Sequence, residues 1–312
     1  MTDFLLLFPG QGSQKPGMAK DLAEAFPAAR AVWDAADATL GASLSKLAFE
    51  GPHEELTLTH NAQPALLTHG AAVWAVTKAA LGPRVRGAAG HSLGEFTAFH
   101  AAGALALADA VALVRRRGEL MFESGASRPG AMAAILGDLS RSIEEICTDA
   151  ESAGVVVPAN YNSLDQTVIS GEVAGVERAM ELAKVAGAKR VIRLNVSGAF
   201  HSPLMAPAAA GLEQALNGAR WHEPAWSVFS NVTANPVRAA ADARLLLLKQ
   251  LTSPVRWAGV IRSMAAAYPS ATFLEMGPGS VLTGLLKRLA PNHPSRTCGT
   301  AAEVESLLLE VA

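Results

Sequence analysis

The stretch VRGAAGHSLGEFTAFHAA, residues 85–102, contains the pattern that decides the fold. Its first five residues are predicted as a short buried strand, and residues 93–102 as a helix. Between them stands Gly90-His91-Ser92-Leu93-Gly94, a G-x-S-x-G motif between a strand and a helix, as this motif requires. A sharp turn there places Ser92 at the positive end of the helix and directs the Leu93 amide toward a developing oxyanion. The stretch predicts a nucleophilic serine on an α/β sheet; a strand-to-helix turn without chemistry is the alternative.

A nucleophilic serine needs a base, and the chain has eight histidines. His91 is adjacent to Ser92, but the turn should send the two side chains apart. In hydrolases with this serine turn the histidine comes late in the chain, which leaves His201, His222 and His293. His201 follows a predicted strand, where sites form, and is favoured. His222 and His293 stay open as alternatives.

Three successive arginines, Arg115 to Arg117, lie on a predicted helix over residues 108–122. The apolar stripe of this helix includes Val114 and Met121, and Arg117 falls along the stripe while Arg116 points away from it. A buried arginine must be paired, and its planar fork suits a carboxylate. The partner is either an internal Asp or Glu or a carboxylate carried by the substrate.

Apolar patterns elsewhere predict an α/β protein. Strands are expected at residues 4–8, 85–89, 228–230 and 272–275. Helices are expected at residues 18–26, 28–40, 63–81, 93–102, 108–122, 243–251, 257–267 and 280–289.

The segment 128–197 has its own order of elements. Strands are predicted at residues 132–136, 155–160, 167–170 and 189–196, and helices at residues 140–152, with Ser140 as N-cap, and 174–186. This β-α-β-β-α-β order is ferredoxin-like. We therefore expect a small subdomain of residues 128–197 inserted into a large one formed by residues 1–127 and 198–312.

Composition narrows the classes of function. Half of the 312 residues are hydrophobic and 17% are charged, which allows a large core. The formal net charge of −2 argues against a nucleic-acid binder. Cys147 and Cys298 stand alone, without a CxxC pair, which is typical of a reducing cytoplasm and of a protein without structural zinc. No apolar run is long enough to predict a membrane span.

Six ordered segments together resemble one family. In chain order the segments are FPGQGSQ, GHSLGE, RRRGELM, AFHSPLM, QLTSPVRW and EMGPG. They lie between residue 8 and about residue 279 and resemble segments of the malonyl-CoA:acyl carrier protein transacylases. These bacterial enzymes of fatty acid synthesis are related to the acyltransferase domains of polyketide synthases. The resemblance implies an α/β-hydrolase-like large subdomain, with a short parallel sheet and many helices, and a ferredoxin-like small one.

The resemblance also implies roles for single residues. Ser92 would be the acyl-accepting nucleophile, His201 its base, and the backbone carbonyl of Gln250 the group that orients the histidine. The amides of Gln11 and Leu93 would form the oxyanion hole.

Arg117 would bind the free carboxylate of malonate. Gln63, Asn162 and Asn231 match polar positions that line the family's site. Phe200, with Ala199 before it, matches the bulky pattern associated with malonyl, so that methylmalonyl is expected to react poorly.

The implied reaction moves malonyl from coenzyme A to the phosphopantetheine thiol of an acidic acyl carrier protein, through a malonyl-serine intermediate. No metal, no bound cofactor, no nucleic acid and no membrane is implied, and we expect a cytoplasmic monomer that meets its carrier transiently. A basic rim of Lys189, Arg190, Lys287 and Arg288 is a candidate docking surface. The carrier could serve fatty acid synthesis, a polyketide pathway or malonate decarboxylation.

Three other functions are weighed against this one. A serine thioesterase acting on carrier proteins would use the same Ser92 and His201 but has no need of Arg117. A non-catalytic scaffold would not need these three residues. A nucleotide-binding protein is disfavoured, because GQGSQK has Lys15 at the position of the third glycine of G-x-G-x-x-G.

Overall fold

The computed structural model describes residues 2–196 and 198–311. Its larger sheet has the strand order β10-β9-β1-β2-β7-β8. All neighbours are parallel except β7 and β8, which are antiparallel. The strands are β1 (Phe4–Phe8), β2 (Val85–Gly90), β7 (Ser227–Phe229), β8 (Pro236–Val237), β9 (Thr272–Met276) and β10 (Ser295–Cys298).

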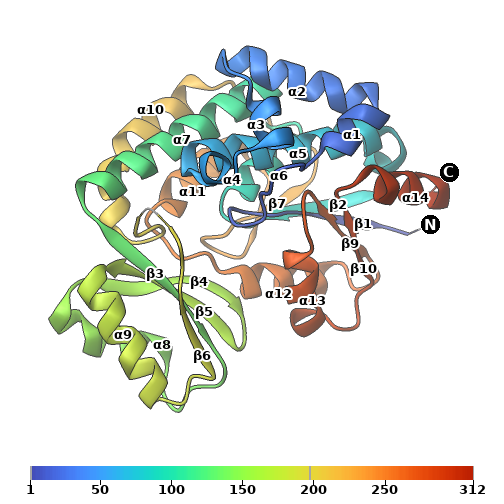
Figure 1. Cartoon of the computed structure of the whole chain (residues 1–312). Helices are drawn as coiled ribbons and strands as arrows, with labels where there is room; N and C mark the ends of the chain where they lie inside the picture. The colour runs from blue at the N-terminus through green and yellow to red at the C-terminus, as the bar shows by residue number, and fades with distance from the viewer. Residues whose placement is uncertain (1, 197, 312) are drawn as a thin grey trace.

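Helices cover both faces of this sheet, which explains why β1 is apolar at every position (Figure 1). Phe4, Leu6 and Phe8 point into a large core, whereas Leu5 and Leu7 point into a smaller core on the opposite face. The helices of the large core are α1 (Lys20–Ala25), α2 (Pro27–Leu40), α3 (Leu44–Glu50), α4 (His53–Thr57), α5 (Thr59–Leu81), α6 (Gly94–Ala101), α7 (Leu107–Ser127), α10 (Ala209–Gly218), α11 (Ala240–Gln250) and α14 (Ala301–Val311). The helices of the smaller core are α12 (Trp257–Ala267) and α13 (Val281–Leu289).

The second sheet is antiparallel, with the order β4-β5-β3-β6. Its strands are β3 (Gly130–Leu136), β4 (Val156–Ser163), β5 (Gln166–Glu172) and β6 (Arg190–Arg193). Two helices, α8 (Ile143–Ala150) and α9 (Val173–Val185), pack on its outer face over a third apolar core (Figure 1). The chain order β3-α8-β4-β5-α9-β6 is the ferredoxin-like order. The subdomain boundaries at residues 127/128 and 197/198 stay a prediction.

Two details of this smaller sheet differ from the sequence prediction. Ser142 caps α8, because its side chain accepts from the Glu145 amide and Glu145 bonds back to the Ser142 amide; Ser140 instead donates to the Ala186 carbonyl. The strand β6 ends at Arg193, three residues before the predicted end, because Leu194, Asn195 and Val196 turn to line a cavity.

Six elements were not predicted: α3, α4, α10, β8, β10 and α14. Short 3-10 turns, also outside the prediction, occupy Gly82–Arg84, Glu151–Ala153 and Pro203–Ala208. Three helices extend beyond their predicted ends by three residues or more, since α5 begins at Thr59, α11 begins at Ala240 and α7 continues to Ser127.

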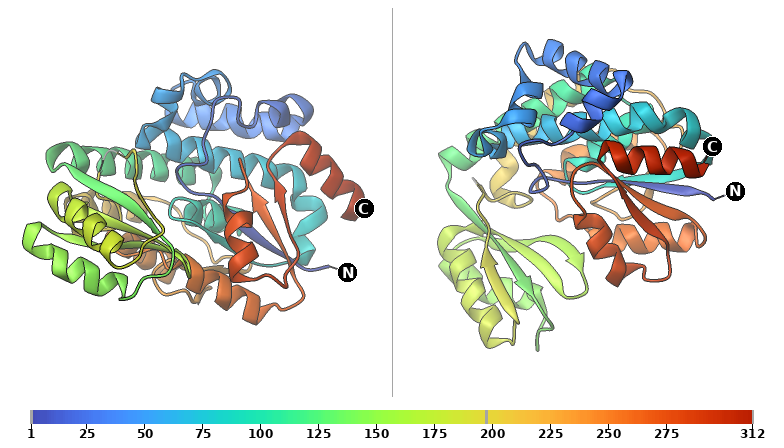
Figure 2. Two further views of the ribbon diagram at one scale, coloured as in Figure 1. Left: turned by 60° about the horizontal axis from the view of Figure 1, so that its bottom comes forward. Right: turned by 45° about the vertical axis from the view of Figure 1, so that its right-hand side comes forward.

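The smaller sheet is fastened to the larger part along β4. The Tyr161 amide donates to the Val255 carbonyl at 2.8 Å, and the Val255 amide donates to the Ala159 carbonyl at 2.8 Å. This bridge joins the smaller sheet to the larger part of the molecule, and the two parts lie side by side in both views of Figure 2. No helix among the described residues is long and apolar enough to cross a membrane.

Candidate active site

The turn between β2 and α6 holds Ser92 in a left-handed backbone conformation, with φ of +51°. Only close packing tolerates this in a non-glycine residue. A Cβ atom at Gly90 would overlap the backbone of Gly94, so the turn needs glycine at that position. Ser92 therefore stands at the tip of the sharp turn that the G-x-S-x-G motif predicts.

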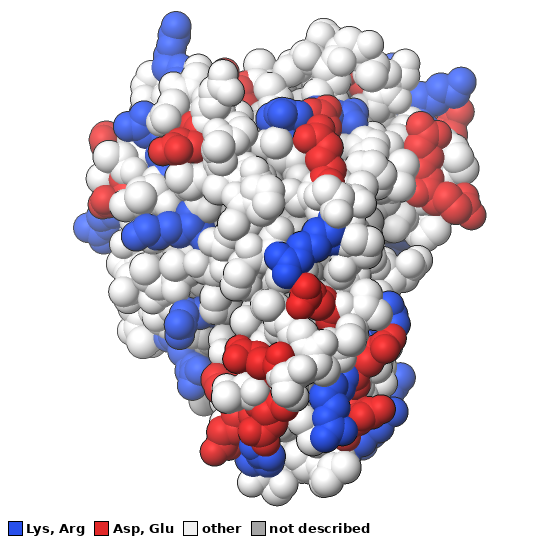
Figure 3. Space-filling view, turned by 90° about the vertical axis from the view of Figure 1, so that its left-hand side faces the viewer, with Lys and Arg blue, Asp and Glu red and all other residues white. Residues whose placement is uncertain are grey.

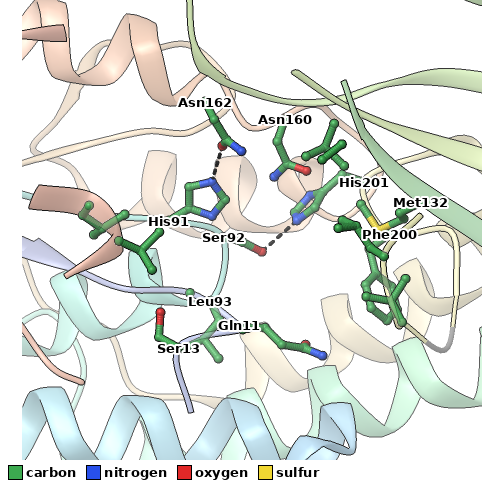
Figure 4. Close-up of a pocket in the computed structure, with 18 of the residues that line it drawn as sticks. Gln11, Ser13, His91, Ser92, Leu93, Met132, Asn160, Asn162, Phe200 and His201 are labelled. Atoms are coloured by element: carbon green, nitrogen blue, oxygen red, sulfur yellow. Dashed lines mark hydrogen bonds between the residues drawn. The ribbon is translucent and has the colours of Figure 1, made fainter. Parts of the chain in front are cut away.

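Ser92 forms a hydrogen bond with His201 (Figure 4). Ser92 Oγ lies 2.7 Å from His201 Nε2, and His201 Nδ1 lies 2.9 Å from the Gln250 carbonyl oxygen. Because a carbonyl can only accept, Nδ1 must carry the proton and the neutral ring presents an unprotonated Nε2 to the serine. The serine, the histidine and the Gln250 carbonyl are thus in the order required for general-base activation.

The other histidine candidates lie elsewhere. His222 is exposed, and His293 packs against the Phe273 ring at 5.5 Å. His91 lines the cavity but turns away from Ser92, as expected, and its Nε2 lies 2.8 Å from Asn162 Oδ1 (Figure 4).

Arg117 is the buried arginine of α7, with 1% of its surface exposed. Its Nη2 donates to Ser92 Oγ at 3.0 Å, so its guanidinium lies directly beside the nucleophile. Arg116 points outward to Glu119 and Glu123, and Arg115 donates to Asn61 at the margin. The helical periodicity therefore placed Arg116 and Arg117 correctly.

Two glutamine side chains hold the Arg117 guanidinium. Nη1 donates to Gln63 Oε1 at 2.7 Å, and Nη2 donates to Gln250 Oε1 at 3.0 Å. Gln63 is fully buried behind the arginine and is not among the residues that line the cavity, so its predicted contact with substrate stays a prediction. Its part is to orient Arg117. The Phe96 ring lies 5.6 Å from the guanidinium carbon on another side.

Asn231 clamps the serine turn from behind. Its Oδ1 accepts from the Ser92 amide at 2.7 Å, and its Nδ2 donates to the Gly90 carbonyl at 2.8 Å. Asn231 is fully buried and outside the cavity lining, so its predicted contact with substrate also stays a prediction. It fixes the strained turn.

The cavity in front of Ser92 has a volume of about 650 Å³ and lies between the two sheets. Asn162 from β4 and Phe200, next to His201, belong to its wall, as predicted (Figure 4). Asn160 from β4 and Met132 from β3 also line it and were not predicted. The wall is mainly apolar with a few polar groups that converge near Ser92, which is typical of a ligand site.

The amides of Gln11 and Leu93 belong to two loops that meet at this cavity. Within residues 2–196 and 198–311, neither amide donates a hydrogen bond to another protein group. Both donors are therefore free for an oxygen atom of a bound substrate.

Burial dominates the electrostatics of the site. Burial, with a further contribution from the positive Arg117, lowers the pKa of His201 to about 3, although the Gln250 carbonyl opposes the shift. Burial lowers the pKa of Arg117 to about 10, which leaves it cationic at neutral pH. Burial raises the pKa of Glu95 to about 7, against the effect of its hydrogen bonds and of Arg117.

Glu95 is the main residue that sequence reasoning missed. It is fully buried, and its Oε2 accepts from Gln250 Nε2 at 2.7 Å and from the Asn231 amide at 3.2 Å. One signal was available, because an acidic residue in the apolar stretch GEFTAF, three residues after Ser92, must lie one helical turn beneath it. Among the described residues, no group of three His, Cys, Asp or Glu side chains is placed to hold a metal ion.

Comparisons with known proteins agree with this geometry. The family model described as acyl transferase domain matches residues 5–303. A malonyl CoA-acyl carrier protein transacylase of Bacillus subtilis (strain 168) is 49% identical over 291 residues, which cover 93% of this chain and 91% of that protein.

Solved structures agree as well. The crystal structure of an acyl-carrier-protein-S-malonyltransferase from Bartonella henselae superposes with a TM-score of 0.94 at 41% identity, and covers 99% of each chain. A malonyl-transacylase solved in complex with its type II PKS acyl-carrier protein has a TM-score of 0.94 at 39% identity, covering 99% of this chain and 100% of that one. The chain therefore belongs to the acyl transferase domain family, within its group of malonyl CoA-acyl carrier protein transacylases.

Proposed function

We propose that the protein transfers a malonyl group from malonyl-CoA to the phosphopantetheine thiol of an acyl carrier protein, for fatty acid or polyketide synthesis. The observation that carries the proposal is the buried Arg117, whose Nη2 lies 3.0 Å from Ser92 Oγ. A malonyl group attached to Ser92 has its free carboxylate one methylene beyond the ester carbonyl. Arg117 is placed to pair with that carboxylate.

The first half-reaction acylates Ser92. The serine oxygen attacks the thioester carbonyl while its proton passes to His201 Nε2, 2.7 Å away. The Gln250 carbonyl holds the ring and stabilises the imidazolium that forms. The C–S bond then breaks, the leaving sulfur takes the proton from His201, and malonyl-serine and free coenzyme A result.

The second half-reaction runs in reverse order with a different thiol. The phosphopantetheine thiol gives its proton to His201, and its sulfur attacks the ester carbonyl of malonyl-Ser92. The C–O bond breaks, and Ser92 recovers the proton from His201. In both halves the carbonyl oxygen becomes an oxyanion, which the free amides of Gln11 and Leu93 are proposed to bind. The cycle uses no metal and no bound cofactor.

The acyl group is selected by charge and shape. Acetyl would leave the buried guanidinium of Arg117 without a direct ion-pair partner, whereas malonyl supplies a carboxylate that can pair with it. Phe200 is 6% exposed and borders the cavity near His201, so that we expect methylmalonyl to react poorly. Comparable kcat/KM values for the two thioesters would contradict this part of the proposal.

The proposed partner is an acidic acyl carrier protein that docks transiently on a monomer. Arg288, one of the four predicted rim residues, lines the cavity mouth and pairs with Asp165, while Lys189, Arg190 and Lys287 are exposed. Acidic and basic side chains lie interspersed on the face shown in Figure 3. We expect single basic residues near the mouth to guide the carrier. The two unpaired cysteines support a place in the cytoplasm.

Intact-mass measurement tests the proposal. Malonyl-CoA should add one malonyl group to the protein, and Ser92→Ala should abolish the addition. Arg117→Ala should slow malonylation about 100-fold or more, since a buried charge pair is lost, and should remove the preference over acetyl. Arg116→Ala is the matched control, because Arg116 lies on the exposed face of the same helix and should change neither rate. Equal labelling of the unmodified protein by acetyl-CoA would contradict the role of Arg117.

A serine thioesterase remains the second candidate, because it would use the same Ser92 and His201. A thioesterase predicts that the malonyl-Ser92 ester is hydrolysed as fast in the presence of a holo acyl carrier protein as in its absence. The proposed transfer predicts that the malonyl mass appears on the carrier much faster than free malonate appears. Failure of Ser92 to label at all would instead favour a scaffold.

A further inference from the structure

Arg117 is a buried cation whose direct partners are all neutral. Its three hydrogen bonds go to Gln63, Gln250 and Ser92, and none of the salt bridges within the described residues includes it. Its Nε atom is buried without a partner. A buried cation without an anion is strongly destabilising, so the empty site needs a negative charge nearby.

Glu95 is placed to supply that charge through one intervening side chain. Gln250 Oε1 accepts from Arg117 Nη2 at 3.0 Å, and Gln250 Nε2 donates to Glu95 Oε2 at 2.7 Å. The Gln250 amide thus lies between the cation and the carboxylate with both of its ends satisfied. Because all three side chains are fully or almost fully buried, solvent screens the attraction between Arg117 and Glu95 very little.

The other groups that face Glu95 are neutral. Asn231 and Ser230 approach from the loop after β7, and Gln250 approaches from α11. Arg117, from α7, is the charged group among the described residues that acts on Glu95. His201 and His91 lie on the cavity side, and His201 is itself influenced by Arg117. The charge state of Glu95 therefore depends mainly on whether Arg117 is compensated by something else.

We propose that Glu95 is a proton-accepting counter-charge for Arg117: it is ionised while the site is empty, and it takes up one proton from solvent when a malonyl carboxylate pairs with Arg117. This proposal rests on the proposed function, because it needs malonyl in the site. The charge balance is simple. One anion arrives with the substrate, and one anion is neutralised at Glu95, so that Arg117 faces a single negative charge in both states.

The surroundings of Glu95 allow its carboxylate to take up a proton. Its Oε1 atom has no hydrogen-bond partner, so a proton added there breaks neither of the bonds that Oε2 accepts. Burial raises its pKa to about 7, and the positive Arg117 opposes that shift. A malonyl carboxylate offsets the positive charge and adds a like charge, and both effects raise the pKa of Glu95 further.

The sign of the pH dependence follows. Binding that takes up a proton weakens as the pH rises above the pKa of the empty site. Malonyl-CoA affinity should therefore fall above pH 7, by up to about tenfold per pH unit, whereas acetyl-CoA affinity should not follow this trend. The malonyl carboxylate itself is ionised throughout this range and contributes no proton.

Calorimetry on the full chain with Ser92→Ala tests the proposal without turnover. The difference between the binding enthalpies measured in phosphate and in Tris buffer gives the number of protons taken up. At pH 8 we expect about 0.5 to 1 proton for malonyl-CoA and close to none for acetyl-CoA. Adding Glu95→Gln, which keeps the side chain's shape, should reduce the malonyl value to near zero. The proposal would be overturned if the variant with Glu95→Gln took up as many protons on binding malonyl-CoA as the protein with Ser92→Ala alone. It would also be overturned if the protein with Ser92→Ala alone took up no proton.

Glu275→Gln is the matched control, because Glu275 is the other fully buried carboxylate among the described residues and bonds the amides of Leu282 and Thr283. It should leave proton uptake unchanged. If Glu95→Gln does not fold, the fall of the malonyl-to-acetyl affinity ratio between pH 7 and 9 still tests the idea, and a constant ratio contradicts it. Failure of the proposed function looks different, since malonyl-CoA would then not label the unmodified protein at Ser92.

Discussion

Both reacting residues are among the four non-glycine residues with positive φ in the described part of the chain, together with Ala19 and Ala234. Ser92 has φ of +51° and His201 has φ of +57°, both in the left-handed region that non-glycine residues rarely adopt. Such conformations cost about 1–3 kcal/mol each and persist only when neighbours enforce them. Asn231 enforces the first by binding both the Ser92 amide and the Gly90 carbonyl, and the Gln250 carbonyl fixes the ring of the second. In these two conformations Ser92 Oγ and His201 Nε2 lie within hydrogen-bonding distance.

The low pKa of His201 predicts an unusual pH profile. Because burial and then Arg117 lower this pKa to about 3, the imidazole stays neutral and able to accept a proton throughout the range from pH 5 to pH 7. The kcat/KM for malonylation of Ser92 should therefore be nearly constant over that range. A base with an ordinary pKa of 6.5 would lose roughly thirtyfold between pH 7 and pH 5. Rapid-quench mass measurements decide between the two, and a fall centred near pH 6.5 would contradict the assignment.

Single residues were predictable where the signal was local. Ser92 followed from five adjacent residues, and Arg117 from the periodicity of one helix. His201 could only be favoured over His222 and His293, because the approach of its ring to Ser92 depends on tertiary packing. The Gln250 carbonyl leaves no mark on sequence at all, since every residue has a carbonyl. Glu95 was overlooked because its partners lie 136 and 155 positions away.

At the scale of elements, the loop after β1 and the turn after β2 form one packed unit. The His91 amide donates to the Phe8 carbonyl at 3.0 Å, and a Cβ atom at Gly10 would lie 2.5 Å from the His91 carbonyl oxygen. The stretch FPGQGSQ therefore presses its backbone against the nucleophile turn, which brings the Gln11 amide to the cavity.

Gly10→Ala should disturb this unit. The added methyl group meets backbone, which cannot move aside as a side chain can, so the loop must shift away from the turn. We expect a loss of about 1–3 kcal/mol in the free energy of unfolding and at least a tenfold slower malonylation of Ser92. Urea unfolding and intact-mass kinetics measure the two effects.

Gly218→Ala is the control for this substitution. Gly218 ends α10, and a Cβ atom there would meet nothing within 4 Å. It should change neither stability nor rate appreciably. A Gly10→Ala protein that acylates at the normal rate would show that the position of the loop does not matter to catalysis.

Helices and strands with a strong apolar pattern could be predicted from the sequence, whereas those with a weak apolar pattern could not. The continuous apolar run of β1 predicts a strand covered on both faces, and the structure agrees. The strand β10 has the sequence SRTC and is partly exposed, so only its pairing with β9 makes it a strand. The helix α8 was found, but the choice between Ser140 and Ser142 as its cap depended on Glu145.

On the scale of the whole molecule, the site is made by bringing two sheets together. The order of the elements of the smaller sheet could be predicted, because each has its own periodicity. Its position over Ser92 could not, because that position depends on the long-range bridge between β4 and Val255. The first and last described residues, Thr2 and Val311, lie close together, since Arg84 donates to the carbonyl of each (Figure 2).

The C-terminal segment is attached to the core through a buried histidine. His69 of α5 is 2% exposed, and its Nε2 lies 2.7 Å from the Gly299 carbonyl oxygen, just after β10. Its Nδ1 is buried without a partner. Burial lowers the pKa of His69 to about 4, although the Gly299 carbonyl and two acidic residues, Asp21 and Glu303, oppose the shift.

This histidine should make the whole fold sensitive to acid. Its folded pKa of about 4 lies below the ordinary 6.5, so the unfolded chain binds more protons between these two values. Stability is therefore present above pH 6.5 and is lost as the pH falls toward 4, by about 3 kcal/mol from this group. His69→Gln, whose amide can still donate to Gly299, should lose about 2–3 kcal/mol less than the unmodified protein between pH 6.5 and pH 4.5, measured by urea unfolding. The exposed His53→Gln is the matched control and should keep the original slope. An unchanged slope in His69→Gln would contradict the assignment, because it would mean that His69 does not stay neutral in the folded protein.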